Sequence, residues 1–286
     1  MVAEPARGGP VSMTRRQRNT GLIATAIAAV IFITPFLYIF FMAMKTKKEA
    51  ALFLFTLPSE WHFWDNLTEV IKARNYMLLL AYFNSILITV GAVSLLIVFG
   101  AMVGYILQRR KSGWNRVIYA AVLVGLIVPP AVVPTIWVLQ GLHLFKTIYG
   151  MVLIQVAYGL AFSVLLFRSF IGTIPRDLDE AAVIDGARPL QIFLRVILPL
   201  LKPVTVTLIV VQSIAIFNDF TNPLYYLPGK ENVTVQLTLF NFQTQFQSQF
   251  NLLFMNILLV TIPPLIVFVF FNRQIVAGMT SGGVKG

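Results

Sequence analysis

The chain alternates between long apolar stretches and short polar breaks, and the apolar stretches are long enough to cross a bilayer. We predict six membrane-spanning helices, at about residues 21–44, 83–107, 117–139, 150–167, 204–225 and 252–271. Most of them reach or exceed the roughly 20 residues that a helix needs to span the hydrocarbon. The pattern therefore predicts an all-α, multi-pass membrane protein.

The first apolar stretch has a competing interpretation as a secretory signal peptide, because three arginines precede it, at positions 15, 16 and 18. Its apolar run is longer than that of a typical signal sequence, and three lysines follow it without a small-residue cleavage site. We therefore predict that it is retained as the first membrane helix.

Composition supports the membrane assignment and excludes several other classes. The chain is 58% hydrophobic and 12% charged, whereas a soluble domain carries about 25% charged residues. It has no cysteine, which excludes disulfides and thiolate metal sites. Its two histidines, His62 and His143, lack the spacing of metal ligands, so no metal site is predicted. The net charge of +11 could suggest nucleic acid, but the basic residues lie between apolar runs, and no nucleic-acid binding is expected.

Lysine and arginine are distributed unevenly over the polar segments. Of the 22 basic residues, 15 fall in the amino terminus, the segments after the second and fourth spans and the tail, and 7 fall elsewhere. Because basic residues collect on the cytoplasmic side, both termini and the segment after span four are expected in the cytoplasm. The resulting organisation is a cytoplasmic segment 1–20, a first helix with an extracytoplasmic segment 21–82, a core domain 83–272 that includes a cytoplasmic loop 169–203, and a cytoplasmic tail 273–286.

The longest polar break, residues 174–199, has the pattern of two short helices around Gly186. Pro175 suits a first helical turn, and the carboxylates at positions 177, 179 and 180 favour the start of a helix. Gly186 can adopt the left-handed conformation that ends a helix. Ala181 and Ala182 would let the backbone of a partner approach closely. The residues alone fit either a docking surface for a partner or an amphipathic connector on the bilayer surface.

The same loop resembles the EAA motif of the permease subunits of ABC importers, through Glu180-Ala181-Ala182, Asp185-Gly186-Ala187 and Ile197-Leu198-Pro199. Four other pieces resemble the carbohydrate-importer branch of that family, near the smaller maltose-type permease subunit: Asn84-Ser85, Pro130 with Pro134, Phe217-Asn218-Asp219-Phe220 and the glycine-rich tail 280–286. The resemblance covers about residues 83–286. The chain departs from it at Phe217, where the family often has tryptophan, and at Asp219, where glutamate is common.

The resemblance implies a type I ABC importer permease fold and a sugar cargo, with a di- or oligosaccharide favoured. The chain would form half of the translocation pore, and residues 169–203 would be its coupling loop. The implied ATPase-coupling residues are Glu180, Ala181, Ala182, Asp185, Gly186, Leu198 and Pro199, and an ATPase contact at the carboxyl terminus would use Gly282, Gly283 and Lys285.

The resemblance also implies partners that supply what this chain lacks. They are a second permease subunit, two ATPase subunits that hold ATP and Mg²⁺, an extracytoplasmic solute-binding protein and the lipid of a prokaryotic inner membrane. The sequence contains no G-x-x-x-x-G-K-[ST] phosphate loop. We therefore predict a transport subunit that is not an enzyme and binds no cofactor itself.

Two polar or proline-containing spots within the spans are candidates for the pore or gate. Pro130 and Pro134 interrupt the third span, and Asn218 and Asp219 are the most polar spot near the fifth. No sugar-binding residue is identified. The alternatives are a permease for another small solute, such as a polyamine or phosphate, and an ion-coupled secondary transporter. Secondary transporters commonly have paired repeats and intramembrane charges, and the sequence shows no repeat and few such charges.

Overall fold

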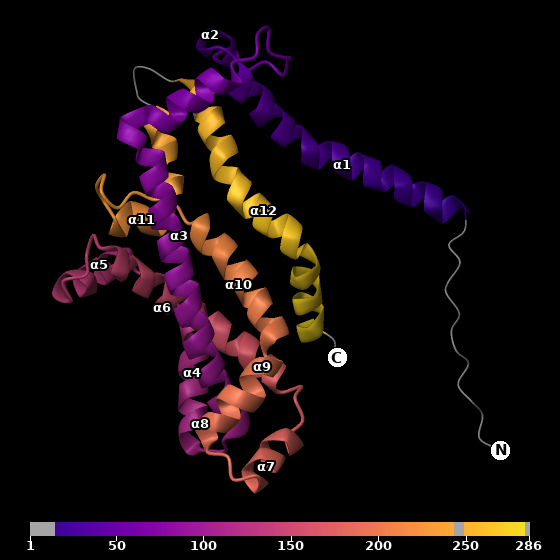
Figure 1. Cartoon of the computed structure of the whole chain (residues 1–286), viewed down its shortest axis with the longest axis vertical. Coiled ribbons are helices and arrows are strands. Elements are labelled where there is room, and N and C mark those ends of the chain that lie inside the picture. The colour runs from indigo at the N-terminus through magenta and orange to yellow at the C-terminus, as the bar shows by residue number, and fades with distance from the viewer. Residues whose placement is uncertain (1–14, 243–248, 284–286) are drawn as a thin grey trace.

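The structure is a computed structural model that describes residues 15–242 and 249–283, and in these ranges it contains helices and no strands (Figure 1). The longer helices are α1 (Arg15–Met44), α3 (Phe63–Arg109), α4 (Gly113–Ile127), α5 (Val132–Gly141), α6 (Ile148–Ile171), α10 (Lys202–Phe217) and α12 (Phe250–Gly283). The shorter ones are α2 (Lys47–Ala50), α7 (Asp177–Ile184), α8 (Pro189–Gln191), the π-helical segment Ile192–Ile197, α9 (Leu198–Leu200), α11 (Thr221–Tyr226) and the 3₁₀ segment Val235–Phe242. The predicted all-α class is confirmed.

Four of the predicted spans are single helices long and apolar enough to cross a membrane, within α1, α3, α6 and α12. The other two are bent pairs, so that the described residues give six spans if each pair counts as one. The fifth span begins after a 72° bend between Pro189–Leu200 and Lys202–Phe217. It was predicted to run to residue 225, but α10 ends at Phe217 and a separate short helix, α11, follows. The sixth span is predicted to end at residue 271, but the helix continues to Gly283.

The third predicted span is not one continuous helix. α4 ends at Ile127, and α5 starts at Val132 after a bend of 120°. Pro129 and Pro130 lie in this break, and their missing N–H groups and rigid rings prevent the helix from continuing. Pro134 lies in the first turn of α5, where a helix tolerates proline.

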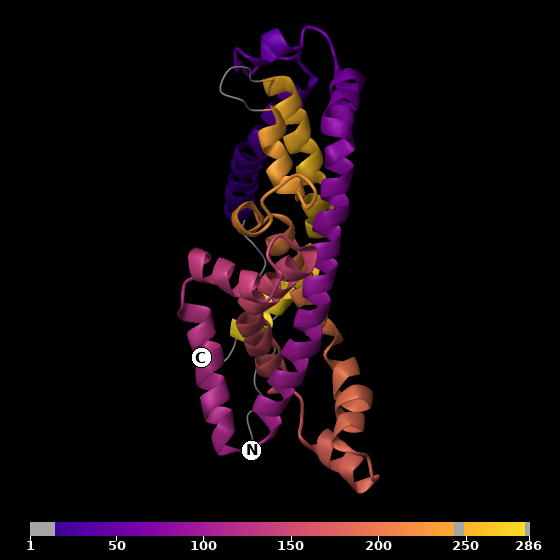
Figure 2. The ribbon, with the colours of Figure 1, turned by 90° about the vertical axis from the view of Figure 1, so that its left-hand side faces the viewer.

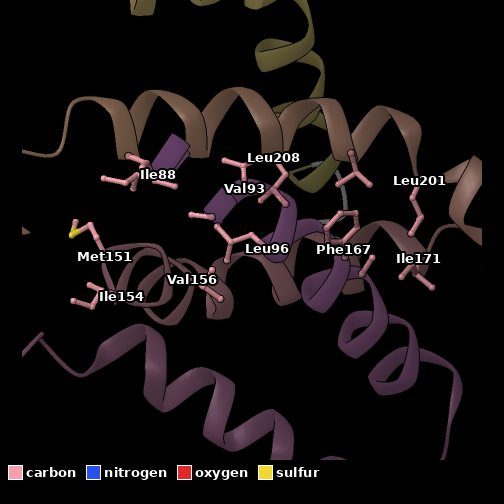
Figure 3. Packing of buried hydrophobic residues seen from close by; sticks show 14 of the residues in the cluster. Ile88, Val93, Leu96, Met151, Ile154, Val156, Phe167, Ile171, Leu201 and Leu208 are labelled. Atoms are coloured by element: carbon pink, nitrogen blue, oxygen red, sulfur yellow. The ribbon is translucent and has the colours of Figure 1, made fainter. Parts of the chain in front are cut away.

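The centre of the molecule is the contact between α3, α6 and α10. α3 runs nearly the full length of the molecule (Figure 2), and its apolar side chains pack with those of α6 in one cluster. Leu96, Phe167 and Leu208, one from each helix, are all fully buried and lie close together in Figure 3. Burial of such side chains, each worth about 1.5–3 kcal/mol, holds the three helices together.

Two glycines allow α3 and α6 to approach closely. Gly100 and Gly104 are four residues apart on α3 and face α6 as a small-x-x-x-small pair. A Cβ added at Gly100 would lie 2.8 Å from Ser163 Cβ, and one added at Gly104 would lie 3.0 Å from Phe167 Cβ. Any larger residue would therefore push the two helices apart.

We expect the Gly100→Ala substitution to lower the thermal stability of the purified protein. Although alanine favours helix by about 1 kcal/mol, overpacking a tight contact costs about 1–3 kcal/mol. Gly125→Ala in α4 is the matched control, since its Cβ would lie 3.8 Å from Ala161 Cβ, an ordinary contact. Thermal unfolding in detergent compares the two variants, and equal melting temperatures would show that the helices are not packed as closely as described.

The C-terminal end of α1 is held to the rest of the molecule by hydrogen bonds from buried asparagine side chains. Asn66 Nδ2 donates to the carbonyl oxygens of Ala43 (2.9 Å) and Lys45 (3.0 Å), and Asn251 Nδ2 donates to Asn66 Oδ1 (2.8 Å). The rest of α1 extends away from the body (Figure 1), and its apolar span is 0% buried within the chain. This helix is therefore free to contact lipid or another subunit.

Candidate functional site

The loop singled out by the sequence forms a helical hairpin at one end of the molecule, which we call the coupling hairpin; it comprises α7, the turn at 185–188 and the segment Pro189–Leu200 (Figure 1). Gly186 has φ +81°, the left-handed conformation predicted for it. Gly186 N donates to Val183 O and Ala187 N donates to Ala182 O, both at 3.0 Å, which is the Schellman pattern of a helix end. The local sequence therefore determines the turn.

The inner face of α7 is attached to the end of α3. Asp179 Oδ1 accepts a hydrogen bond from Tyr105 Oη (2.8 Å), and Asp179 Oδ2 lies 3.0 Å from Arg109 Nη2. The same Arg109 nitrogen donates to Ile174 O (3.0 Å), just before the hairpin. Side-chain exposure is 9% for Arg109 and 17% for Asp179, so this is a largely buried ion pair.

Sequence reasoning missed this ion pair, because it treated Asp179 as one of three acidic residues at a helix start. The signal in the sequence is helical spacing, because Asp179 lies three residues before Ala182 and the two share one face of the helix. In the structure both residues are half-buried, whereas Glu180 and Ala181 are exposed. A carboxylate on the inner face of a helix needs a partner, and Arg109 follows the second apolar stretch. The local sequence does not show which of the neighbouring basic residues pairs with Asp179.

The second half of the coupling hairpin is anchored by apolar contacts. Ile192, Phe193 and Ile197 are buried in the main cluster, and the Phe193 and Tyr105 ring centroids are 5.4 Å apart. Leu198 packs against the same cluster, whereas Pro199 is exposed. The hairpin is thus joined to α3 on one side and leads into α10 on the other.

The outer face of the coupling hairpin is apolar, although none of the residues that the structure describes covers it. Exposure is 86% for Ile184, 61% for Val183 and 60% for Leu190. Glu180, Ala181, Asp185 and Gly186 are exposed on the same hairpin, but Ala182 faces inward and packs against the main cluster. Of the seven sequence-predicted coupling residues, Ala182 and Leu198 therefore lie on the inner side.

The polar spot of the fifth span is a hydrogen-bonded break between α10 and α11. Asp219 Oδ2 accepts from Gln155 Nε2 on α6 (2.5 Å) and from Asn222 Nδ2 (2.7 Å). Asn218 Oδ1 accepts from Gln236 Nε2 (3.0 Å). Both side chains therefore have partners within the chain, and they hold the end of α10 against α6 and the segment after α11.

The remaining sequence-predicted positions are dispersed. Pro130 and Pro134 are exposed at the bend between α4 and α5. Gly282 and Gly283 form the last residues of helix α12 rather than an irregular tail. Lys285 lies outside the described residues. The structure therefore brings the coupling residues together in one hairpin and leaves the pore candidates at two other places.

The described helices include four single spans and two bent pairs, which is the architecture of a multi-pass membrane protein, and the coupling hairpin lies exposed at one end of it. The chain belongs to the family described as binding-protein-dependent transport system inner membrane component, whose profile matches residues 96–281. It is therefore a transport subunit of the inner membrane and not an enzyme.

Several named relatives match nearly the whole chain. The melibiose/raffinose/stachyose import permease protein MelC of Bacillus subtilis is 28% identical, with 96% of this chain and 98% of the relative covered. The probable starch degradation products transport system permease protein AmyC of Thermoanaerobacterium thermosulfurigenes is 31% identical, with 91% and 94% covered.

Solved structures show the same fold. A chain of a bacterial ABC transporter involved in the import of the acidic polysaccharide alginate has a TM-score of 0.79 at 22% identity, covering 91% of this chain and 98% of its own. The MetNI methionine ABC transporter has a TM-score of 0.54 at 16% identity, covering 71% and 96%. One of these transporters imports a polysaccharide and the other is a methionine transporter, so similarity of fold alone does not identify the transported solute.

Proposed function

We propose that this chain forms half of the translocation pore of an ATP-driven sugar importer and docks onto ATPase subunits through the coupling hairpin. The observation that carries the proposal is the outer face of that hairpin, where Val183, Ile184 and Leu190 are 60–86% exposed and no described helix covers them. A partner groove would bury these side chains. Glu180 at the edge would pair with a basic group, and Ala181 would permit close approach.

The sugar cargo rests on the names of the relatives. They import melibiose, raffinose and stachyose, starch degradation products, and diacetylchitobiose, which favours a di- or oligosaccharide. A polyamine or phosphate cargo has no support among them, and family membership favours ATP-driven import over ion-coupled transport.

The attachment of the coupling hairpin suggests how motion would be transmitted. The buried pair of Asp179 and Arg109 joins α7 to α3, and the segment Pro189–Leu200 leads directly into α10. A displacement of the hairpin by the ATPases, which would hold ATP and Mg²⁺, would therefore move two spans together. The α4–α5 bend with Pro130 and Pro134 would line the path, while Asn218 and Asp219 would hold the break in span five at a gate.

The proposed complex contains a second permease, two ATPases and an extracytoplasmic solute-binding protein, and both termini face the cytoplasm. The exposed α1 offers surface for the second permease and for membrane lipid. The end of α12, with Gly282 and Gly283, would contact the ATPases from the cytoplasmic side, together with Lys285, which lies outside the described residues.

A pulldown of the tagged chain from its native membrane in mild detergent, followed by mass spectrometry, tests this assembly. We expect an ATPase, a second permease and a solute-binding protein, and the last can be screened calorimetrically against di- and oligosaccharides. Recovery of the intact chain alone would contradict the proposal, and a binding protein that takes only non-sugar solutes would contradict the cargo.

A further inference from the structure

A second charged feature lies beside the coupling hairpin, where the end of α3, the start of α4 and the end of α6 meet. A cavity of about 250 Å³ opens there, and we call it the basic pocket; its lining includes Arg110, Lys111, Ser112, Arg116, Tyr119 and Arg168. The turn that joins α3 to α4 lies at the same end of the molecule as the coupling hairpin (Figure 2). The basic pocket therefore lies at the proposed cytoplasmic boundary of the membrane.

The charge of the basic pocket is not balanced within the chain. Its lining contains four cationic side chains and no carboxylate. Among the described side chains, Arg109 is the one lysine or arginine with a carboxylate within 4.0 Å, and that residue lines the neighbouring groove instead. Like charges gathered in one concavity repel each other, so the arrangement favours an anion from outside the chain.

One cation of the basic pocket is held in place and has an unused donor. The Arg168 guanidinium lies over the Tyr119 ring, 3.9 Å from its centroid. Its Nε is buried and has no hydrogen-bond partner. A buried N–H without an acceptor is costly, and because Arg168 lines the basic pocket, an anion bound there would lie beside this guanidinium.

The start of α4 adds to the positive potential. Ser112 precedes the helix with an extended backbone and makes no side-chain cap hydrogen bond, and the first turn contains no acidic residue. The N-terminus of a 15-residue helix therefore presents its free N–H groups and partial positive charge beside the four cations.

We propose that the basic pocket binds the phosphate-containing headgroup of an anionic phospholipid, with the acyl chains along α4. α4 has no buried residue in this chain, and Val117 and Ile118, which lie between the lining residues Arg116 and Tyr119, are 59% and 40% exposed. Trp114, 74% exposed at the start of α4, suits the membrane–water interface. A free phosphate would use only the cations, whereas a lipid uses the cations and the apolar wall together. Basic pockets between membrane helices on the cytoplasmic side are suited to such headgroups.

The inference uses the proposed membrane orientation and makes no use of the sugar cargo or the ATPase contact. The proposal for the basic pocket therefore does not depend on which solute the complex transports.

The test uses the whole complex, stripped of lipid in detergent and reconstituted in nanodiscs of phosphatidylcholine with a minor fraction of phosphatidylglycerol. Native mass spectrometry of the released complex measures the retained lipid. We expect at least one phosphatidylglycerol, preferred over phosphatidylcholine by about tenfold or more, and a Lys111→Gln/Arg116→Gln variant should lose at least tenfold of that preference. Within the part of the chain that the structure describes, neither side chain makes a hydrogen bond or ion pair, so the fold should be unaffected.

Two controls make the result specific. Lys202→Gln removes an exposed charge at the start of α10, outside the coupling hairpin and the basic pocket, and it should retain the preference. Lys111→Arg/Arg116→Lys keeps both charges and should also retain it. An unchanged preference in the Lys111→Gln/Arg116→Gln variant would overturn the proposal. So would displacement of the lipid by millimolar inorganic phosphate, which would indicate a site for the free ion, or loss of the ATPase subunits instead of lipid, which would indicate a protein contact.

Discussion

An Ile184→Asp variant is expected to insert and fold normally but to lose sugar uptake almost completely. Ile184 is 86% exposed, so the change should alter the stability of this chain by no more than about 0.5 kcal/mol. In a docked complex the same side chain would be buried, and an unpaired carboxylate there would cost several kcal/mol. Because about 1.4 kcal/mol corresponds to a tenfold change in affinity, uptake and substrate-stimulated ATP hydrolysis should fall at least tenfold.

Two matched variants separate docking from a general effect of charge. Ile184→Leu keeps the apolar contact and should transport normally. Thr173→Asp adds the same charge at an exposed position before α7, outside the hairpin tip, and should also transport. Normal uptake by Ile184→Asp in vesicles with the purified complex would show that the outer face of the coupling hairpin is not a docking surface.

Removing the carboxylate of Asp179 should release α7 from α3 and abolish transport even though the outer face of the hairpin is unchanged. Asp179→Ala leaves Arg109 buried without its counter-charge and Tyr105 Oη without its acceptor. Breaking one side of a buried pair costs about 3–5 kcal/mol. We expect faster hydrogen exchange across α7, measured by mass spectrometry, with exchange in the central contact of α3 and α6 unchanged.

The paired variant Arg109→Met/Asp179→Leu is the control for this prediction. It removes both charges, so no buried charge remains unpaired, and much of the protection of α7 should return. Asp179→Asn should be intermediate, because it keeps an acceptor for Tyr105 but no charge. If exchange across α7 in Asp179→Ala matches that of the unmodified protein, the ion pair does not hold the hairpin.

The sequence determines the features that depend on neighbouring residues. Gly186 ends α7 because the left-handed conformation is cheap only for glycine, and this could be predicted without any tertiary contact. Pro129 and Pro130 likewise predict a break, but not its size, because proline disrupts a helix without setting the direction in which the next one packs. The 120° bend therefore appears only in the structure.

Contacts between distant segments were beyond prediction from one sequence. Asp179 pairs with Arg109, and the sequence offers several other basic residues nearby that it does not contact. The alanines of the hairpin illustrate the same limit, since Ala181 is exposed and Ala182 faces inward, although both were predicted to face a partner. Ala181 and Ala182 are adjacent on α7 and therefore point in different directions. The packing of α7 against α3 determines which of the two faces outward, where a partner could contact it.

The bend after α4 has a consequence for hydration. α4 is 15 residues long, about 22 Å, and falls short of the roughly 30 Å of hydrocarbon. The non-helical backbone at 128–131 is exposed in the isolated chain, and within a bilayer such backbone needs water or another protein chain. Since the sequence has no cysteine, single cysteines placed at 128–131 will report solvent access there through a membrane-impermeant thiol reagent. We therefore expect water to reach the backbone at this bend within the membrane.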